Sequence, residues 1–161
     1  KPKNVTVEGE LGIIAGVEDD IFVKDSRSYL ADPDVCVEYV NATGVDVLAP
    51  AIGTAHGLYR KQPNIDFDLL NEITQRVDIP LAIHGGTGLS EETLKKCIAK
   101  GGSKINVSTE LKHLFRNSIE EYYKANPEDY EPVKIIKYME QNVIRRIEEF
   151  IDVFGSTNRA L

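Results

Sequence analysis

The sequence predicts an α/β fold with a parallel sheet, built from four consecutive strand–helix units in the manner of half a barrel. Short, almost continuously apolar strands alternate with amphipathic helices, as in a parallel sheet covered by helices. Each strand ends in Gly, His, Ser, Thr or Asn, the position where barrels carry their functional residues. A doubly wound nucleotide-binding sheet is the weaker alternative, because the first strand lacks a following G-x-G-x-x-G loop.

The first two units are expected as follows. Alternating apolar and polar residues predict a strand over residues 5–11, followed by a Gly-rich loop at 12–16. A helix begins after the N-cap Asp32, with Pro33 at its first position, and Gly44 ends it. The second strand covers residues 45–52 and closes on the loop 53–57.

The pattern then repeats. Asp66 and Ser90 are suitable N-caps for two further helices, one before and one after a short strand at 81–83. The fourth strand is expected over 105–107. Two helices, at about 110–124 and 131–154, close the chain. We interpret residues 1–161 as one region, half of a single barrel domain.

Composition excludes several classes of protein. A formal net charge of −7 argues against nucleic acid and anionic membranes as main partners, and no apolar run approaches the ~18 residues of a membrane span. Cys36 and Cys97 both lie on apolar helix stripes, which predicts buried free thiols in a reducing compartment such as the cytoplasm.

His56 and His84 are the candidate metal ligands. Each follows a predicted strand and precedes a glycine, so two imidazoles could converge on one metal at the same edge of the sheet. Hydrogen-bonded structural histidines are the alternative. His113 lies on a predicted helix and is expected at the surface.

Two small-residue loops are candidates for binding phosphate. Gly85, Gly86 and Thr87 precede a Ser90-capped helix, so backbone N–H groups and the helix dipole favour an anion, although tight turns also need glycine. The next strand end, 106–109, adds further N–H and hydroxyl donors.

Three carboxylates are candidates for the same site. Glu8 and Glu10 share one face of the first strand and would be paired with Lys or Arg, or bind metal. Glu18 belongs to an acidic run beside glycines, which is either a mobile loop that delivers a carboxylate or a solvated surface segment.

Five segments, in order along nearly the whole chain, resemble class II fructose- and tagatose-bisphosphate aldolases. They are Val7–Gly12 (VEGELG), Gly16–Asp19 (GVED), Ala51–Gly57 (AIGTAHG), His84–Gly88 (HGGTG) and Lys104–Leu111 (KINVSTEL). The resemblance implies a TIM (β/α)8 barrel and a lyase of carbohydrate metabolism and glycolysis. Its reaction would be the zinc-dependent, reversible cleavage of fructose or tagatose 1,6-bisphosphate to dihydroxyacetone phosphate and glyceraldehyde 3-phosphate. A homodimer or homotetramer is also implied.

The resemblance also implies roles for individual residues. His56 and His84 would bind zinc, with Glu10 an alternative ligand, and Glu18 would be the catalytic base. The backbone around residues 55, 57, 85 and 87 would hold Na⁺ or K⁺. Arg159 would reach the phosphate of the second substrate. The phosphate of dihydroxyacetone phosphate would be bound by Gly57, Gly85, Gly86, Thr87, Asn106, Val107, Ser108 and Thr109.

Two features depart from the family pattern. Thr87 stands where the family usually has Ser, which keeps the hydroxyl. The family's first zinc histidine and the adjacent catalytic Asp have no counterpart in this sequence, which contains three histidines. We therefore expect the second half of a longer aldolase, present as a fragment or as one of two chains. The alternative is a non-catalytic half-barrel that binds phosphate or metal.

Overall fold

The computed structural model describes residues 3–18, 21–23, 30–59 and 63–160; for 15–18 and 21–23 only the backbone is described. The chain divides into two compact units, Lys1–Val107 and Ser108–Leu161. Each unit is described by itself below.

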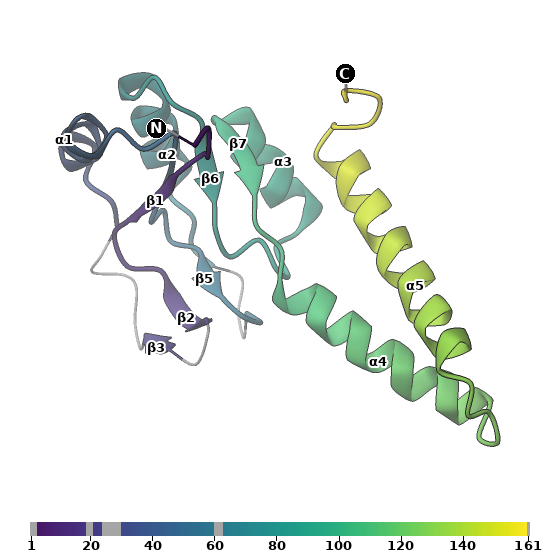
Figure 1. The fold of residues 1–161 in the computed structure, drawn as a ribbon. Coiled ribbons are helices and arrows are strands. Elements are labelled where there is room, and N and C mark those ends of the chain that lie inside the picture. Colours follow the sequence, from purple (N-terminus) through teal and green to yellow (C-terminus); the bar gives the residue numbers. More distant parts are fainter. Residues whose placement is uncertain (1–2, 19–20, 24–29, 60–62, 161) are drawn as a thin grey trace. The chain divides into compact units, whose positions relative to one another are not determined.

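The first unit is built on a four-stranded parallel sheet in the order β1-β4-β6-β7 (Figure 1). The strands are β1 (Glu8–Leu11), β4 (Val47–Pro50), β6 (Leu81–Ile83) and β7 (Gly102–Ile105). Helices α1 (Pro33–Thr43), α2 (Phe67–Arg76) and α3 (Glu91–Ala99) connect them. Because neighbouring strands follow one another in the chain, right-handed crossovers place all three helices on one face and leave the other for side chains with chemistry.

Local capping determines where these helices begin, as predicted. The Asp32 carboxylate accepts hydrogen bonds from two N–H groups of the first turn of α1, and Gly44 ends that helix at φ +63°. Asp66 caps α2 and Ser90 caps α3 through the N–H groups three residues on. Each such cap is worth about 1 kcal/mol of stability.

Apolar side chains of the strands and helices form the core of the first unit. Burying each of the larger ones stabilises the fold by roughly 1.5–3 kcal/mol. Cys36 and Cys97 are buried free thiols, as expected. Among the fully buried side chains of this unit are Leu48, Ile52, Leu70, Ile73, Leu81, Ile83 and Leu94.

A second, smaller sheet was not predicted. It has the order β3-β2-β5 and consists of β2 (Ala15–Glu18), β3 (Ile21–Val23) and β5 (Ala55–His56). β2 pairs antiparallel with β3 and parallel with β5. The prediction of a loop over residues 12–16 is therefore wrong at its end. The pairing joins segments about forty residues apart, which local sequence patterns do not reveal.

Three predicted strands differ from the observed ones. β1 starts at Glu8 rather than at residue 5, and β4 is shorter than predicted at both ends. β7 covers Gly102–Ile105 rather than 105–107. The start of this strand was not predicted because Gly102 and its polar neighbours are not typical of a buried strand. Glycine is nevertheless required there, since a Cβ on Gly102 would lie 2.9 Å from the Ile83 side chain.

The second unit is a helical hairpin of α4 (Thr109–Ala125) and α5 (Pro132–Val153), close to the predicted ranges. Two polar contacts run between the helices: Asn142 donates to the buried Ser118 hydroxyl at 3.0 Å, and Arg146 pairs with Glu110 at 2.6 Å. The pairing of early α4 with late α5 makes the helices antiparallel. Of the helices described, none has the length and apolar character needed to cross a membrane.

Candidate metal centre

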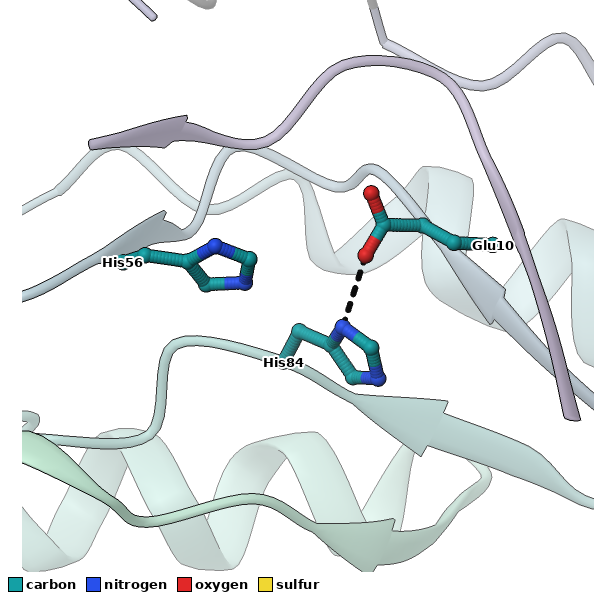
Figure 2. Close-up of side chains that lie close together, drawn as sticks. All are labelled: Glu10, His56 and His84. Carbon is teal, nitrogen blue, oxygen red and sulfur yellow. Dashed lines mark hydrogen bonds and ion pairs between the residues drawn. The ribbon is translucent and has the colours of Figure 1, made fainter. Parts of the chain in front are cut away.

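Glu10, His56 and His84 converge on one point of the first unit. Each offers a ligand atom, and these atoms lie within 4.8 Å of one another. The two imidazole rings are 5.8 Å apart between centroids and tilted by 38°. Figure 2 shows the Glu10 carboxylate beside both rings, with its bond to His84 dashed. The two histidines converge, as the sequence predicted, and their binding of a metal stays a prediction.

The two histidines reach the cluster from different elements. His84 directly follows β6, as predicted. His56 does not end β4, which stops at Pro50; it lies in β5, where it pairs in register with Gly16. The intervening segment bends at Gly53, whose φ is +99° and where a Cβ would lie 2.3 Å from the Asn64 carbonyl oxygen. A residue with a Cβ would therefore not fit at this bend between β4 and His56.

Both ring nitrogens of His84 contact carboxylates of β1. Nδ1 lies 2.7 Å from Glu10 Oε2, and Nε2 lies 2.9 Å from Glu8 Oε1. The second oxygen of Glu8 accepts a hydrogen bond from Lys104 Nζ at 2.9 Å. Glu8 and Glu10 thus share one face of the strand, as the alternation predicted, and Glu8 makes the lysine ion pair that was one of its alternatives.

The Glu8–Lys104 pair shows that the sheet is strongly curved. The two residues lie on the outermost strands, β1 and β7, with β4 and β6 between them. Strands about 4.8 Å apart put these edges roughly 14 Å from each other on a flat sheet, where side chains stand perpendicular and would not meet. Their contact therefore places both on a concave face, together with His84.

The ionisation of this cluster follows from its hydrogen bonds. The hydrogen bond to Glu10, reinforced by the one to Glu8, raises the pKa of His84 against the opposing effect of burial. Burial on its own would raise the pKa of Glu8, but bonds from His84 and Lys104 outweigh it and the pKa is lowered.

Tyr59 joins β5, which carries His56, to the segment after β6, which carries His84. Its hydroxyl accepts a hydrogen bond from the Ala55 N–H at 2.9 Å and donates one to the Gly85 carbonyl at 2.7 Å. Burial is the main cause that raises the pKa of this phenol, to about 12. The neutral phenol therefore persists at any ordinary pH and holds residue 55 against residue 85.

Two parts of the predicted phosphate site, Gly86 and Asn106, lie side by side in the first unit. The Gly86 N–H donates to the Asn106 carbonyl at 2.9 Å, and a Cβ on Gly86 would meet Ile105 and Asn106. The Gly86 N–H is therefore engaged within the protein, while Thr87 is buried beside it. Gly57 has φ +93°, with open space where a Cβ would stand.

The remaining predicted residues lie elsewhere. Ser108 and Thr109 open the second unit, where Ser108 precedes α4 without a side-chain cap. Arg159 is exposed near the end of the second unit, and His113 is exposed on α4, as expected. Glu18 ends β2, and its carboxylate lies outside the part of the chain that is described.

A comparison with known families decides the relationship of this chain. The family described as fructose-bisphosphate aldolase class-II matches residues 1–159. The chain belongs to this family. The five collinear segments of the sequence had indicated it, and the Glu10–His56–His84 cluster lies within the matched region.

Solved structures of the aldolase family agree. The YdjI aldolase of Escherichia coli K12 is 31% identical, with a TM-score of 0.81 over 99% of this chain and 53% of its own. A candidate fructose-1,6-bisphosphate aldolase of Coccidioides immitis is 28% identical, with a TM-score of 0.77 over 98% and 55%. The fructose-bisphosphate aldolase of Campylobacter jejuni, at 21% identity, shares the fold with a TM-score of 0.75 over 97% and 53%.

The chain spans about half the length of these structures. Its α/β fold, with a parallel sheet and covering helices, is the partial TIM-barrel arrangement predicted from the alternation of strands and helices and from the strand-end residues.

The donor set fits the metal that this aldolase family generally uses. Two imidazoles and a carboxylate are the nitrogen and oxygen ligands that zinc takes in catalytic sites. Donors on one tetrahedral zinc, each about 2.0–2.1 Å from it, stand roughly 3.3 Å apart. If both residues held one zinc, the 2.7 Å contact between His84 and Glu10 would lengthen by about 0.6 Å. The Glu10 side chain is 38% exposed and can rotate to allow it.

Two residues of the site were not singled out from the sequence. Lys104 sits in a polar stretch that did not resemble a buried strand, and its partner Glu8 is 96 residues away. Nothing in the sequence distinguishes Tyr59 from any other aromatic residue in a predicted loop. The one signal available for Lys104 was a lysine directly before a predicted strand, in a sequence with two carboxylates on its first strand.

Proposed function

We propose that this chain forms the zinc- and phosphate-binding half of a class II ketose-bisphosphate aldolase. The reaction is the reversible cleavage of fructose or tagatose 1,6-bisphosphate to dihydroxyacetone phosphate and glyceraldehyde 3-phosphate. The observation that carries the proposal is the Glu10–His56–His84 cluster, in a chain of the aldolase family.

The metal centre consists of His56 and His84, with Glu10 as an alternative ligand or close neighbour. When bound, zinc supplies Lewis-acid polarisation of the substrate ketone. The chain's own groups orient the ligands: Tyr59 holds the two loops together, and the carboxylates of β1 hold the His84 ring. Such fixed geometry matters because a reacting carbon must be placed within a fraction of an ångström.

Other residues have proposed roles in binding and proton transfer. Glu18 takes the proton from the triose-phosphate carbon and returns it in the reverse direction. Backbone groups around Gly57, Gly85 and Thr87 hold the phosphate, with a monovalent cation beside it. Asn106 and the segment 107–109 extend this cradle, and Arg159 contacts the phosphate of the second substrate.

The chain is proposed to be the C-terminal half of a single (β/α)8 barrel. A third zinc histidine and a catalytic Asp then come from the other half, since catalytic zinc needs three protein ligands and one open position. The open edges of β1 and β7 are where the other half would pair. The complete protein is proposed to be a cytoplasmic homodimer or homotetramer that acts in glycolysis.

Aldolase turnover in the complete protein tests the proposal. Dihydroxyacetone phosphate formation from each ketose bisphosphate is followed in a coupled assay, before and after chelation and zinc replacement. Activity should disappear with chelator and return with zinc. The variant His56→Gln should lose more than about 100-fold, because even outer-shell partners of a metal contribute 10- to 100-fold. The exposed His113→Gln serves as the matched control and should retain full activity.

The non-catalytic half-barrel is the competing function. It predicts that zinc or inorganic phosphate binds while no dihydroxyacetone phosphate forms from either sugar. Turnover that resists exhaustive chelation would instead contradict the metal centre.

A further inference from the structure

We propose that Glu8, held by Lys104, is a positioning residue for the metal ligand His84. It keeps the imidazole proton on Nε2, so that Nδ1 presents its lone pair to the metal. The inference rests on the metal centre proposed above and assigns roles to two residues outside the ligand set.

The two nitrogens of the His84 ring have different neighbours. Nδ1 faces Glu10, which forms the ligand cluster with His56. Nε2 faces Glu8, whose oxygens are not members of that cluster. The ring has only these two nitrogens, so a metal among Glu10, His56 and His84 meets Nδ1.

Glu8 is placed to orient rather than to ligate. Oε1 accepts from His84 Nε2 at 2.9 Å, and Oε2 accepts from Lys104 Nζ at 2.9 Å. Both oxygens are engaged, and the side chain is 26% exposed, compared with 38% for Glu10. Lys104 reaches Glu8 across two intervening strands, so it fixes the carboxylate from the far edge of the sheet.

The chemistry of imidazole explains why a carboxylate belongs there. A metal-bound histidine is neutral, with one nitrogen on the metal and the other protonated. An ionised carboxylate only accepts hydrogen bonds, so its presence at Nε2 selects the tautomer with the proton on that atom. The same contact raises the basicity of the coordinating nitrogen, an effect usually worth 10- to 100-fold in metal affinity.

Metal affinity of the complete protein provides the first test. Zinc affinity is measured by competition with a chromogenic chelator for the wild type, Glu8→Gln, Glu8→Asp and Glu91→Gln. Glu91→Gln is the matched control, because Glu91 pairs with Lys95 on the surface of α3 without contacting a histidine. Glu8→Gln is expected to weaken zinc binding by about 10- to 100-fold, while the control binds like the wild type.

Glu8→Asp separates position from charge. It keeps the negative charge but is one methylene shorter, so it does not span His84 and Lys104 together. Weakened zinc binding in this variant supports positioning. Wild-type affinity in Glu8→Asp, with weak binding in Glu8→Gln, would reduce the effect to charge and overturn the proposal. Wild-type affinity in both variants overturns it as well.

Nitrogen-15 NMR of the histidine rings gives a readout that a merely structural role would not change. In the zinc-bound protein, His84 should carry its proton on Nε2 and coordinate through Nδ1. Coordination through Nε2 overturns the inference. In zinc-bound Glu8→Gln the Nε2 nitrogen-15 resonance of His84 should shift, because its hydrogen bond to a carboxylate is lost, while the circular dichroism spectrum and melting temperature stay close to the wild type. An unchanged Nε2 resonance in that variant also contradicts the proposal.

These outcomes are distinguishable from failure of the proposed function. If the wild-type protein binds no zinc, the metal centre and this inference fall together. If the wild type binds zinc and Glu8→Gln binds it equally well, the metal centre stands and only the role of Glu8 is wrong.

Discussion

The Tyr59 hydroxyl lies 2.7 Å from the carbonyl oxygen of Gly85, which belongs to the loop that follows His84. The same hydroxyl accepts a hydrogen bond from the N–H of Ala55, the residue before His56. One phenol therefore connects the residue before His56, in β5, to the residue after His84.

Tyr59→Phe should destabilise the protein by about 1–3 kcal/mol, because it leaves a part-buried N–H and a carbonyl without their shared partner. The ring remains, so packing is preserved. Urea unfolding measures the loss, and zinc affinity should fall with it. Tyr130→Phe, at a phenol that is 84% exposed, is the control and should change nothing. Equal stability of the two variants would contradict a role for the bridge.

Gly85→Ala should be far more damaging than Gly44→Ala. Both glycines have positive φ, +71° and +63°, so alanine pays a similar backbone strain of about 1–2 kcal/mol at each. At Gly44 nothing lies within 4 Å of the new Cβ, whereas at Gly85 it would lie 2.3 Å from the Ala55 carbonyl oxygen. The difference in melting temperature between the two variants isolates the clash. Similar values would show that the loops do not approach so closely.

The two cysteines should resist thiol reagents until the protein unfolds. Burial raises the pKa of both Cys36 and Cys97 from 9.0 to about 11. At pH 8 that leaves roughly 100-fold less thiolate, the reactive species, and both side chains are fully buried. Labelling with a chromogenic disulfide should be slow in buffer and complete for two thiols in denaturant. Rapid native labelling would contradict the burial of the helix stripes.

The turn between α4 and α5 should lose stability in acid. A hydrogen bond from the Glu131 N–H, with further bonds from Lys134 and Tyr122, lowers the pKa of Asp129 from 3.8 to about 2. A depressed pKa contributes stability that is present above pH 3.8 and is lost as the pH falls toward 2.

Asp129→Asn tests this contribution. The variant should melt at a lower temperature than the wild type at pH 7, and the difference should shrink between about pH 4 and pH 2. The neighbouring exposed Glu128→Gln is the matched control and should follow the wild-type profile. Parallel melting curves for wild type and Asp129→Asn across this range would contradict the assignment.

Much of the fold could be predicted because its signals are local. Asp32, Asp66 and Ser90 cap helices through N–H groups two or three residues away, and Gly44 ends a helix by its own backbone freedom. The second sheet escaped prediction because pairing of β2 with β5 has no local signal. The bounds predicted for β7 were wrong because its glycine and polar residues are explained only by their neighbours on other elements.

The same distinction between local and long-range information applies to the candidate site. The sequence by itself determined the identities and order of the ligand candidates Glu10, His56 and His84, since types and spacing within motifs are properties of the chain. Tertiary structure alone decided that Glu8 and Lys104 meet across two strands, and that Tyr59 joins two loops. Those contacts depend on the curvature of the sheet and the packing of distant segments, which no spacing along the chain encodes.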